Sequence, residues 1–450
     1  MKNLLLVMSF SVLYTFVACS DYLDVKPDDS LTVPDNVQDL QALLDYENVF
    51  NMQYPAAGDI GADYYFLSKA DWDSRDIDAR MTYIWDINAQ NHLDWNYSFQ
   101  RIFHCNVVLD EIDKAKLGSM TEADRDIIKG RAYFYRGWSY FQLAQLYVPY
   151  YAKGMADSEY GLPLQLVSDI NEPVVRSTVH ETYSRIIDDL ERAAELLPDR
   201  VGVPTRPSRA AALGALAKLY LIMGDFELSL YYTENSLDIN DVLLDYNDVD
   251  RDSDIPFKVF NKDVVFHAVM LARSGVHEQG YAFVDTVLVK KYNEYDLRKT
   301  AFLKADDTGL FRFKGSYDGG NYALFSGIAI DELYLIKSEC LARLGREQKA
   351  LEVLNRLLSK RWQKDRFVPM QLASNDDLLT IILEEREKQL LFRGGIRWSD
   401  LRRLNQDPRF AKILVRKLDD RYELIPGDDR YTFMLPFSVI QISGMPQNHR

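Results

Sequence analysis

The segment from Ser326 to Trp362 constrains the fold of this chain most, because it predicts two antiparallel helices that break at Gly345. In both halves apolar side chains recur every three or four residues, the spacing that places them on one helix face. They are Ile330, Leu333, Tyr334 and Leu341 in the first half and Ala350, Val353, Leu354, Leu357 and Leu358 in the second. One such hairpin cannot bury its own apolar face, so the sequence predicts that further helix pairs stack on it.

The order of small and large side chains in this hairpin resembles the tetratricopeptide pattern. Small Ser338 and Ala350 let two helices approach closely, Leu341 fills the groove beside them, and Gly345 makes the turn. Similar periodicity elsewhere predicts four tetratricopeptide-like hairpins, at about residues 95–150, 179–238, 326–362 and 376–405. The matching glycines Gly224 and Gly345 stand much further apart than one repeat of ~34 residues. Long insertions therefore separate the hairpins.

The insertions lack a sustained helical or strand period and predict an irregular, loop-rich lobe made of residues 51–94, 239–325 and 406–450. Within it, Asp263 to Leu271 predicts a short buried strand, and residues 406–450 predict coil with at most short strands. The fold class predicted from these patterns is all-α, mainly helical, with residues 19–450 forming a single domain.

Residues 1–18 predict a signal peptide of the lipoprotein type, cleaved before Cys19. Lys2 precedes an apolar run from Leu4 to Val17, which is shorter than the ~20 residues that a membrane-spanning helix needs. A small residue followed by cysteine, here Ala18 and Cys19, is the bacterial lipobox pattern, so we predict that Cys19 is acylated. The alternative is an ordinary signal peptide cut near Ala18, which leaves a soluble periplasmic protein.

Aromatic residues make up 12% of the chain, and a surplus of Tyr and Trp often serves a binding surface. Many of them fall in the predicted lobe, where loops on a rigid scaffold commonly carry binding residues. Trp72, Tyr83 and Trp85 are the first candidates for stacking on a sugar ring. Lower-ranked candidates for the same site are Asp63, Tyr281, Tyr295 and Tyr322. The alternative is that these side chains fill the lobe's own core.

The sequence predicts no catalytic residue and no cofactor. It has no HExxH, GxSxG, phosphate-loop or CxxC motif, although its 68 Asp and Glu residues leave a glycosidase pair open. The net charge of −15 argues against a nucleic-acid partner. The acidic run from Asp245 to Asp254 invites a calcium loop, but Asp250 and Pro256 stand where such a loop needs Gly and Glu. We therefore predict a solvated acidic loop without metal ligands.

Two cysteines remain after Cys19, and each falls in a predicted helix. A disulfide is permitted in an oxidising compartment, but two buried free thiols at Cys105 and Cys340 are preferred. Three tryptophans, Trp95, Trp138 and Trp398, belong to scaffold helices and are predicted to be structural. Arg397 and Asp400 are predicted to form an ion pair that supports packing rather than a site.

Several segments, in order along nearly the whole chain, resemble the SusD/RagB family of outer-membrane nutrient-uptake lipoproteins. They are the start Cys19-Ser20-Asp21-Tyr22-Leu23-Asp24 with Lys26-Pro27, the helix with Trp95, Tyr97, Ile102, Asn106, Leu109 and Asp113, the run from Arg131 to Tyr147 with Gly161-Leu162-Pro163-Leu164, the segment from Glu384 to Asn405, and the closing motif from Leu435 to Asn448. The pair Gly394-Gly395 departs from the family pattern, which has one residue fewer before the Arg-Trp pair.

This resemblance implies an α-helical fold with four tetratricopeptide-like units and an irregular lobe. It also implies a lipid-anchored protein of the outer membrane that faces the cell exterior, binds an oligosaccharide and delivers it to a SusC-like TonB-dependent transporter barrel. Three alternatives remain open. They are a peptide-capturing lipoprotein of the same kind, an interaction scaffold without a small ligand, and a glycoside hydrolase.

Overall fold

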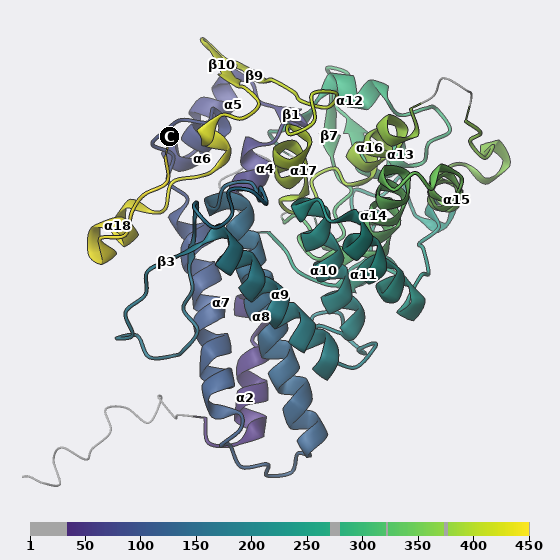
Figure 1. Cartoon of the computed structure of the whole chain (residues 1–450). Helices are drawn as coiled ribbons and strands as arrows, with labels where there is room; N and C mark the ends of the chain where they lie inside the picture. The colour runs from purple at the N-terminus through teal and green to yellow at the C-terminus, as the bar shows by residue number, and fades with distance from the viewer. Residues whose placement is uncertain (1–33, 271–279, 321–322, 373–376, 450) are drawn as a thin grey trace, which may run out of the picture.

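The computed structural model of the protein describes residues 34–270, 280–320, 323–372 and 377–449. Helices dominate it, and its strands are short and paired two by two (Figure 1). The predicted mainly helical fold is thus confirmed. The predicted signal peptide, Cys19 and Tyr322 lie outside the described residues. Within the described ranges, no helix is both long enough and apolar enough to cross a membrane.

The first half of the scaffold consists of α2 (Val37–Leu44), α7 (His92–Glu111), α8 (Glu122–Tyr147) and α9 (Val179–Leu196). Helix α8 packs against both α7 and α9, and the long helices lie side by side (Figure 1). Because it has a neighbour on each side, α8 is buried along nearly its whole second half, including Trp138. A capping box of Thr121 and Asp124 fixes its start.

The second half of the scaffold holds two hairpins, α10 (Arg209–Met223) with α11 (Phe226–Ile239) and α14 (Ile330–Arg343) with α15 (Glu347–Leu358). Both contain a small serine that bonds across the hairpin. The Ser229 hydroxyl donates to the Ala217 carbonyl at 2.8 Å, and the Ser338 hydroxyl donates to the Ala350 carbonyl at the same distance. Helices α11 and α14 pack together, so the two hairpins stack. Residues 179–238 therefore contain three helices, α9 to α11.

The last predicted pair is not a self-packed hairpin. Helix α16 (Leu378–Gln389) packs on α14, whereas α17 (Ile396–Leu404) packs on α4 (Ala57–Gly61), far away in the sequence. Between α16 and α17, Phe392 and Gly395 take left-handed backbone conformations, with φ of 53° and 68°. This turn directs α17 toward the lobe instead of back along α16.

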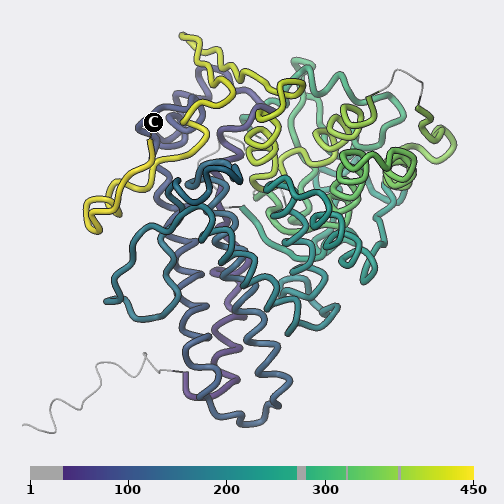
Figure 2. Tube along the Cα trace, viewed as in Figure 1, coloured from purple at the N-terminus to yellow at the C-terminus, as the bar shows by residue number. Residues whose placement is uncertain are grey.

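The lobe is built from short elements that come from all three predicted insertions. Its strand pairs are β1 (Tyr65–Phe66) with β5 (Phe283–Val284), β6 (Leu303–Ala305) with β7 (Phe311–Phe313), and β9 (Leu414–Lys417) with β10 (Arg421–Leu424). Its short helices are α5 (Lys69–Asp73), α6 (Ile77–Tyr83), α12 (Thr286–Lys290) and α13 (Arg298–Phe302). The C-terminal ribbon β9–β10 lies beside the early segment that holds α5 (Figure 2).

Other short elements connect the lobe and the scaffold. They are α3 (Glu47–Phe50), β2 (Tyr160–Pro163) with β3 (Arg176–Thr178), β4 (Val264–Phe266) with β8 (Ile328–Ala329), and α18 (Phe437–Ser443). Within the described part of the strand predicted at residues 263–271, only Val264–Phe266 form a strand, so it is shorter than predicted. Helix α18 lies in a segment predicted to be coil, and this part of the prediction is wrong.

Two apolar clusters form the interior. The larger one runs through the scaffold helices, and the smaller one fills the lobe with Trp72, Tyr83, Phe302 and Phe392. Cys105 and Cys340 are both buried and free, as the sequence favoured. Trp95, Trp138 and Trp398 are buried in the larger cluster, in agreement with their predicted structural role.

Candidate ligand-binding site

The three aromatic residues ranked first for sugar stacking are in the lobe's interior. Trp72 is 8% exposed, and Tyr83 and Trp85 are each 1% exposed. Their polar atoms are satisfied internally: the Trp85 indole donates to the Gly61 carbonyl at 2.9 Å, and the Leu67 amide donates to the Tyr83 hydroxyl at 3.1 Å. Their predicted contact with a ligand stays a prediction, and their burial gives it no support.

Asp63, a further candidate, forms ion pairs that join the lobe to α17. The Arg397 guanidinium donates to its two carboxylate oxygens at 2.6 and 2.8 Å, and Lys412 lies 2.6 Å away. Burial alone would raise the pKa of Asp63, but Arg397 and Lys412 more than offset this and hold the pKa well below its ordinary value. The carboxylate is therefore charged and already has cationic partners.

The predicted ion pair between Arg397 and Asp400 is not formed as such. Arg397 binds Asp63 and Glu387, the latter at 2.9 Å, while Asp400 binds Arg386 at 2.7 Å and Arg403 at 2.8 Å. Both residues do support packing, with different partners from those predicted. Of these partners only Asp63 is far away in the sequence, because Arg386 and Glu387 lie in α16 and Arg403 lies in α17 itself.

Tyr281 and Tyr295, the remaining described candidates, lie in different environments. The Tyr295 ring is half-buried, with the Arg366 guanidinium carbon 5.0 Å from its centroid. The Tyr281 ring is half-buried too, and the guanidinium carbon of Arg75 lies 3.8 Å from its centroid. The two tyrosines thus stack with different arginines and share no partner in these contacts.

Five side chains on or beside the β1–β5 strand pair form what we call the ring surface, namely Phe66, Arg75, Tyr281, Phe283 and Arg312. Strand β1 pairs with β5 so that Phe66 lies opposite Phe283, and their rings stack with centroids 5.5 Å apart at 28°. Tyr281 lies in a turn two residues before Phe283, and both side chains are half-buried while Ala282 between them is buried. The Arg312 guanidinium carbon lies 3.9 Å from the Phe283 centroid. All five side chains are half-buried.

This arrangement combines the two kinds of group that recognise a hydroxyl-rich ring. Partly exposed aromatic rings offer apolar surface to the C–H face of a sugar. A guanidinium that stacks on a ring keeps its N–H groups in its own plane, where they can donate to hydroxyl oxygens; those of Arg75 already donate to the Asp71 carbonyl at 3.2 Å and to the Ser74 hydroxyl at 2.7 Å. Phe66, Phe283 and Arg312 were not among the predicted site residues, because the pairing of β1 with β5 that brings them together leaves no local signal in the sequence.

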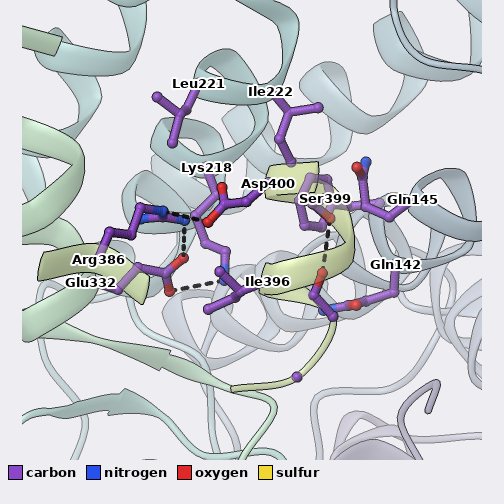
Figure 3. Close-up of a pocket in the computed structure, with 13 residues that line it drawn as sticks. Gln142, Gln145, Lys218, Leu221, Ile222, Glu332, Arg386, Ile396, Ser399 and Asp400 are labelled. Atoms are coloured by element: carbon purple, nitrogen blue, oxygen red, sulfur yellow. Dashed lines mark hydrogen bonds and ion pairs between the residues drawn. The ribbon is translucent and has the colours of Figure 1, made fainter. Parts of the chain in front are cut away.

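The cavity in Figure 3 lies at the centre of the scaffold, between α8, α10, α14, α16 and α17, and is lined by charged side chains. Lys218 donates to Glu332 at 2.9 Å, and Arg386 binds Asp400. Burial lowers the pKa of Lys218, although Glu332 opposes this shift. The cavity volume is about 20 Å³, which accommodates a water molecule but no sugar. We interpret it as an internal ionic junction of the scaffold.

The acidic run borders a cavity of about 600 Å³, which is lined by residues of a single loop between Leu244 and Lys262. Two of its carboxylates have lysine partners: Asp245 binds Lys360 at 3.0 Å, and Asp254 binds Lys304 at 2.7 Å. Among the described residues, no group of three or more His, Cys, Asp or Glu side chains is placed to hold a metal ion.

Residues 21–221 match a family model described as "Starch-binding associating with outer membrane". Among curated proteins, the chain is 24% identical over 354 residues to SusD-like protein P2 of Formosa agariphila, covering 65% of this chain and 68% of that protein.

Solved structures resemble the whole fold. A SusD superfamily protein from Bacteroides thetaiotaomicron has a TM-score of 0.74 at 19% identity, over 92% of this chain and 100% of that one. A structure named "Laminarin binding SusD-like protein" has a TM-score of 0.64 at 17% identity, over 91% of this chain and 97% of that one. At these identities the structures establish the fold alone. The chain is thus similar to SusD-like proteins in part of its sequence and in its overall fold.

Proposed function

We propose that the protein binds an oligosaccharide at the ring surface and acts in glycan uptake at the outer membrane. The observation that carries the proposal is the match to a family described as starch-binding and associated with the outer membrane. The laminarin-binding protein of the same fold supports the same ligand class. Within this chain, the ring surface supplies the chemistry that such a ligand requires, half-exposed rings beside guanidinium groups.

The size of the ring surface suits weak capture. Covering ~100 Å² of apolar surface on one ring contributes at most ~2.5 kcal/mol. Two or three rings with a few hydrogen bonds to the arginines, less the cost of association, give roughly the 4 to 6 kcal/mol of a millimolar to sub-millimolar complex. Such affinity is sufficient where a tethered partner keeps the local ligand concentration high.

The partner that we propose is a SusC-like TonB-dependent transporter barrel, to which the bound glycan is delivered. Acylation of Cys19 would anchor the protein to the outer membrane with the lobe facing the cell exterior. Support for this comes from the lipobox pattern around Cys19 and from the family's association with the outer membrane. The proposed role is binding and delivery, with no catalytic step assigned to any residue.

Isothermal titration with laminarin-type and starch-type oligosaccharides tests the ligand site. We expect wild-type protein to bind at least one of them and Tyr281→Ala and Phe283→Ala each to weaken that binding by about tenfold, since losing one ring contact removes about 1.4 kcal/mol. Tyr231→Ala is the matched control, because Tyr231 is a tyrosine exposed at 57% on α11, outside the lobe. Unchanged affinity in both ring-surface variants would contradict the proposed site.

A further inference from the structure

A second cavity, of about 320 Å³, lies at the carboxyl end of α8 and shares no lining residue with the ring surface. Its walls come from the segment that follows α8, the start of β2 and the C-terminal segment of the chain. Its lining side chains include Tyr150, Met155, Glu159, Tyr160, Asp429 and His449. The volume falls near the lower limit of the ~300–1,000 Å³ typical of small-molecule sites, so it suits one sugar ring rather than a chain.

The cavity wall offers both apolar surface and free acceptors. Tyr150 is half-buried, while Tyr160 and Met155 are 45% and 54% exposed. The carboxylates of Glu159 and Asp429 form no hydrogen bond or ion pair with any residue in the described part of the chain. Because an ionised carboxylate accepts hydrogen bonds at both oxygens, these two groups can receive the hydroxyl hydrogens of a polyol.

Two buried arginines, Arg176 and Arg402, lie behind the cavity wall and contact its backbone or its neighbours. Arg176 donates to the carbonyls of Tyr160 and Gly161 at 3.1 and 2.8 Å, and its guanidinium carbon lies 5.2 Å from the Tyr160 ring centroid. Burial lowers the pKa of Arg176 to about 10, so it remains charged at neutral pH. Arg402 donates to the carbonyls of Gln145 and Val148, close to Tyr150.

Neither arginine has a carboxylate among its bonded partners in the described residues. The cavity lining holds two carboxylates and no lysine or arginine, so it favours a ligand that donates hydrogen bonds over an anion. We propose that it is a second carbohydrate site, which takes a single uncharged pyranose. The tyrosine rings and Met155 contact the sugar ring, and Glu159 and Asp429 accept its hydroxyls. This inference rests on the proposed function in one respect, the choice of carbohydrate as the ligand class.

Saturation-transfer NMR on the full chain with the methyl glycosides of glucose, galactose and mannose tests the site. We expect a signal from at least one glycoside, reduced at least fivefold in both Glu159→Gln and Tyr160→Ala. Glu159→Gln keeps the side-chain shape and leaves the backbone bond from the Val179 amide to the Glu159 carbonyl in place, so this variant should fold even if the tyrosine variant does not. Tyr231→Ala, at another exposed tyrosine, should keep the wild-type signal.

No signal from any of the three glycosides, or a signal that neither variant reduces, would overturn this inference. Repeating the NMR experiment with Tyr281→Ala distinguishes a failure of the second site from a failure of the ring surface. If the second site exists, the monosaccharide signal survives that substitution. Conversely, oligosaccharide titration that responds to Tyr281→Ala but not to Tyr160→Ala supports the ring surface, whatever the outcome at the second cavity.

Discussion

Asp59 shows how a single buried side chain makes this fold sensitive to pH. It is fully buried in α4, and it accepts hydrogen bonds from the Gly395 amide and from the Tyr64 hydroxyl, the latter at 3.3 Å. It forms no ion pair with a basic residue in the described ranges. Burial raises the pKa of Asp59 to about 7, because the charged carboxylate has lost water and gained no cation.

We expect Asp59→Asn to flatten the dependence of stability on pH. In the wild type the folded pKa of about 7 exceeds the unfolded value of 3.8, so the folded state binds the extra proton between these values and loses stability as pH rises from about 4 to 7. The loss amounts to a few kcal/mol, at most about 4. Urea unfolding at pH 5 and pH 8 measures it. Asp126→Asn, at an exposed aspartate, is the control. An identical pH response of wild type and Asp59→Asn would refute the assignment.

Asp63→Ala should lower the free energy of unfolding rather than act only on ligand binding. Removing one partner leaves Arg397 buried with Glu387 alone, and breaking a buried ion pair costs about 3–5 kcal/mol. We expect a value near the lower end, since Glu387 remains. Asp73→Ala is the matched control, because its pair with Lys69 is at the surface and contributes about 0–1 kcal/mol. Equal stability of Asp63→Ala and wild type in urea titration would show that this ion pair is dispensable.

The role of the candidate aromatics could be predicted only in part from the sequence. A tryptophan in a segment without periodicity, such as Trp72 or Trp85, gives no sign of which way it faces. Burial of Trp85 depends on the carbonyl of Gly61 and on Arg416, whose guanidinium carbon lies 5.2 Å from the indole ring. Arg416 itself donates to the carbonyl of Tyr65 at 2.6 Å, a contact between segments that are far apart in the chain.

At the scale of elements, the junction of α4 with α17 depends on two glycines. A Cβ added at Gly61 would lie 2.9 Å from the Trp398 ring, and one at Gly58 would lie 3.1 Å from the Trp398 Cβ. We therefore expect Gly61→Ala to destabilise the fold by about 1–3 kcal/mol through overpacking. Gly154→Ala should be neutral, because nothing lies within 4 Å of its Cβ position. Thermal unfolding of both variants measures the difference, and equal midpoints would show that Trp398 moves aside freely.

Helices with a clear period of 3.6 were predictable, whereas their partners were not. The hairpin α14–α15 carries its own turn glycine and complementary small residues, so its packing is encoded locally. Helix α17 has a periodic sequence too, but its partner is the five-residue α4, which no periodicity reveals. The uncharged segment of α18 was missed because a seven-residue helix without buried side chains gives only a weak pattern.

At the scale of the whole molecule, three insertions meet in one lobe with its own apolar cluster. The ring surface exists because residues 65–66 pair with residues 283–284, and the C-terminal segment closes over the same lobe through Arg416. Such long-range pairing cannot be derived from local pattern in a single sequence. The scaffold, by contrast, follows from periodicity, and this is why the mainly helical fold was predictable while the geometry of the candidate site was not.

A crystal structure of the protein with a laminarin-type or starch-type oligosaccharide that it binds in solution tests the central claim most directly. We expect a sugar ring in van der Waals contact with Tyr281 or Phe283, with its hydroxyls within hydrogen-bond distance of Arg75 or Arg312. An oligosaccharide that is bound elsewhere on the molecule, with the ring surface unoccupied, would contradict the account.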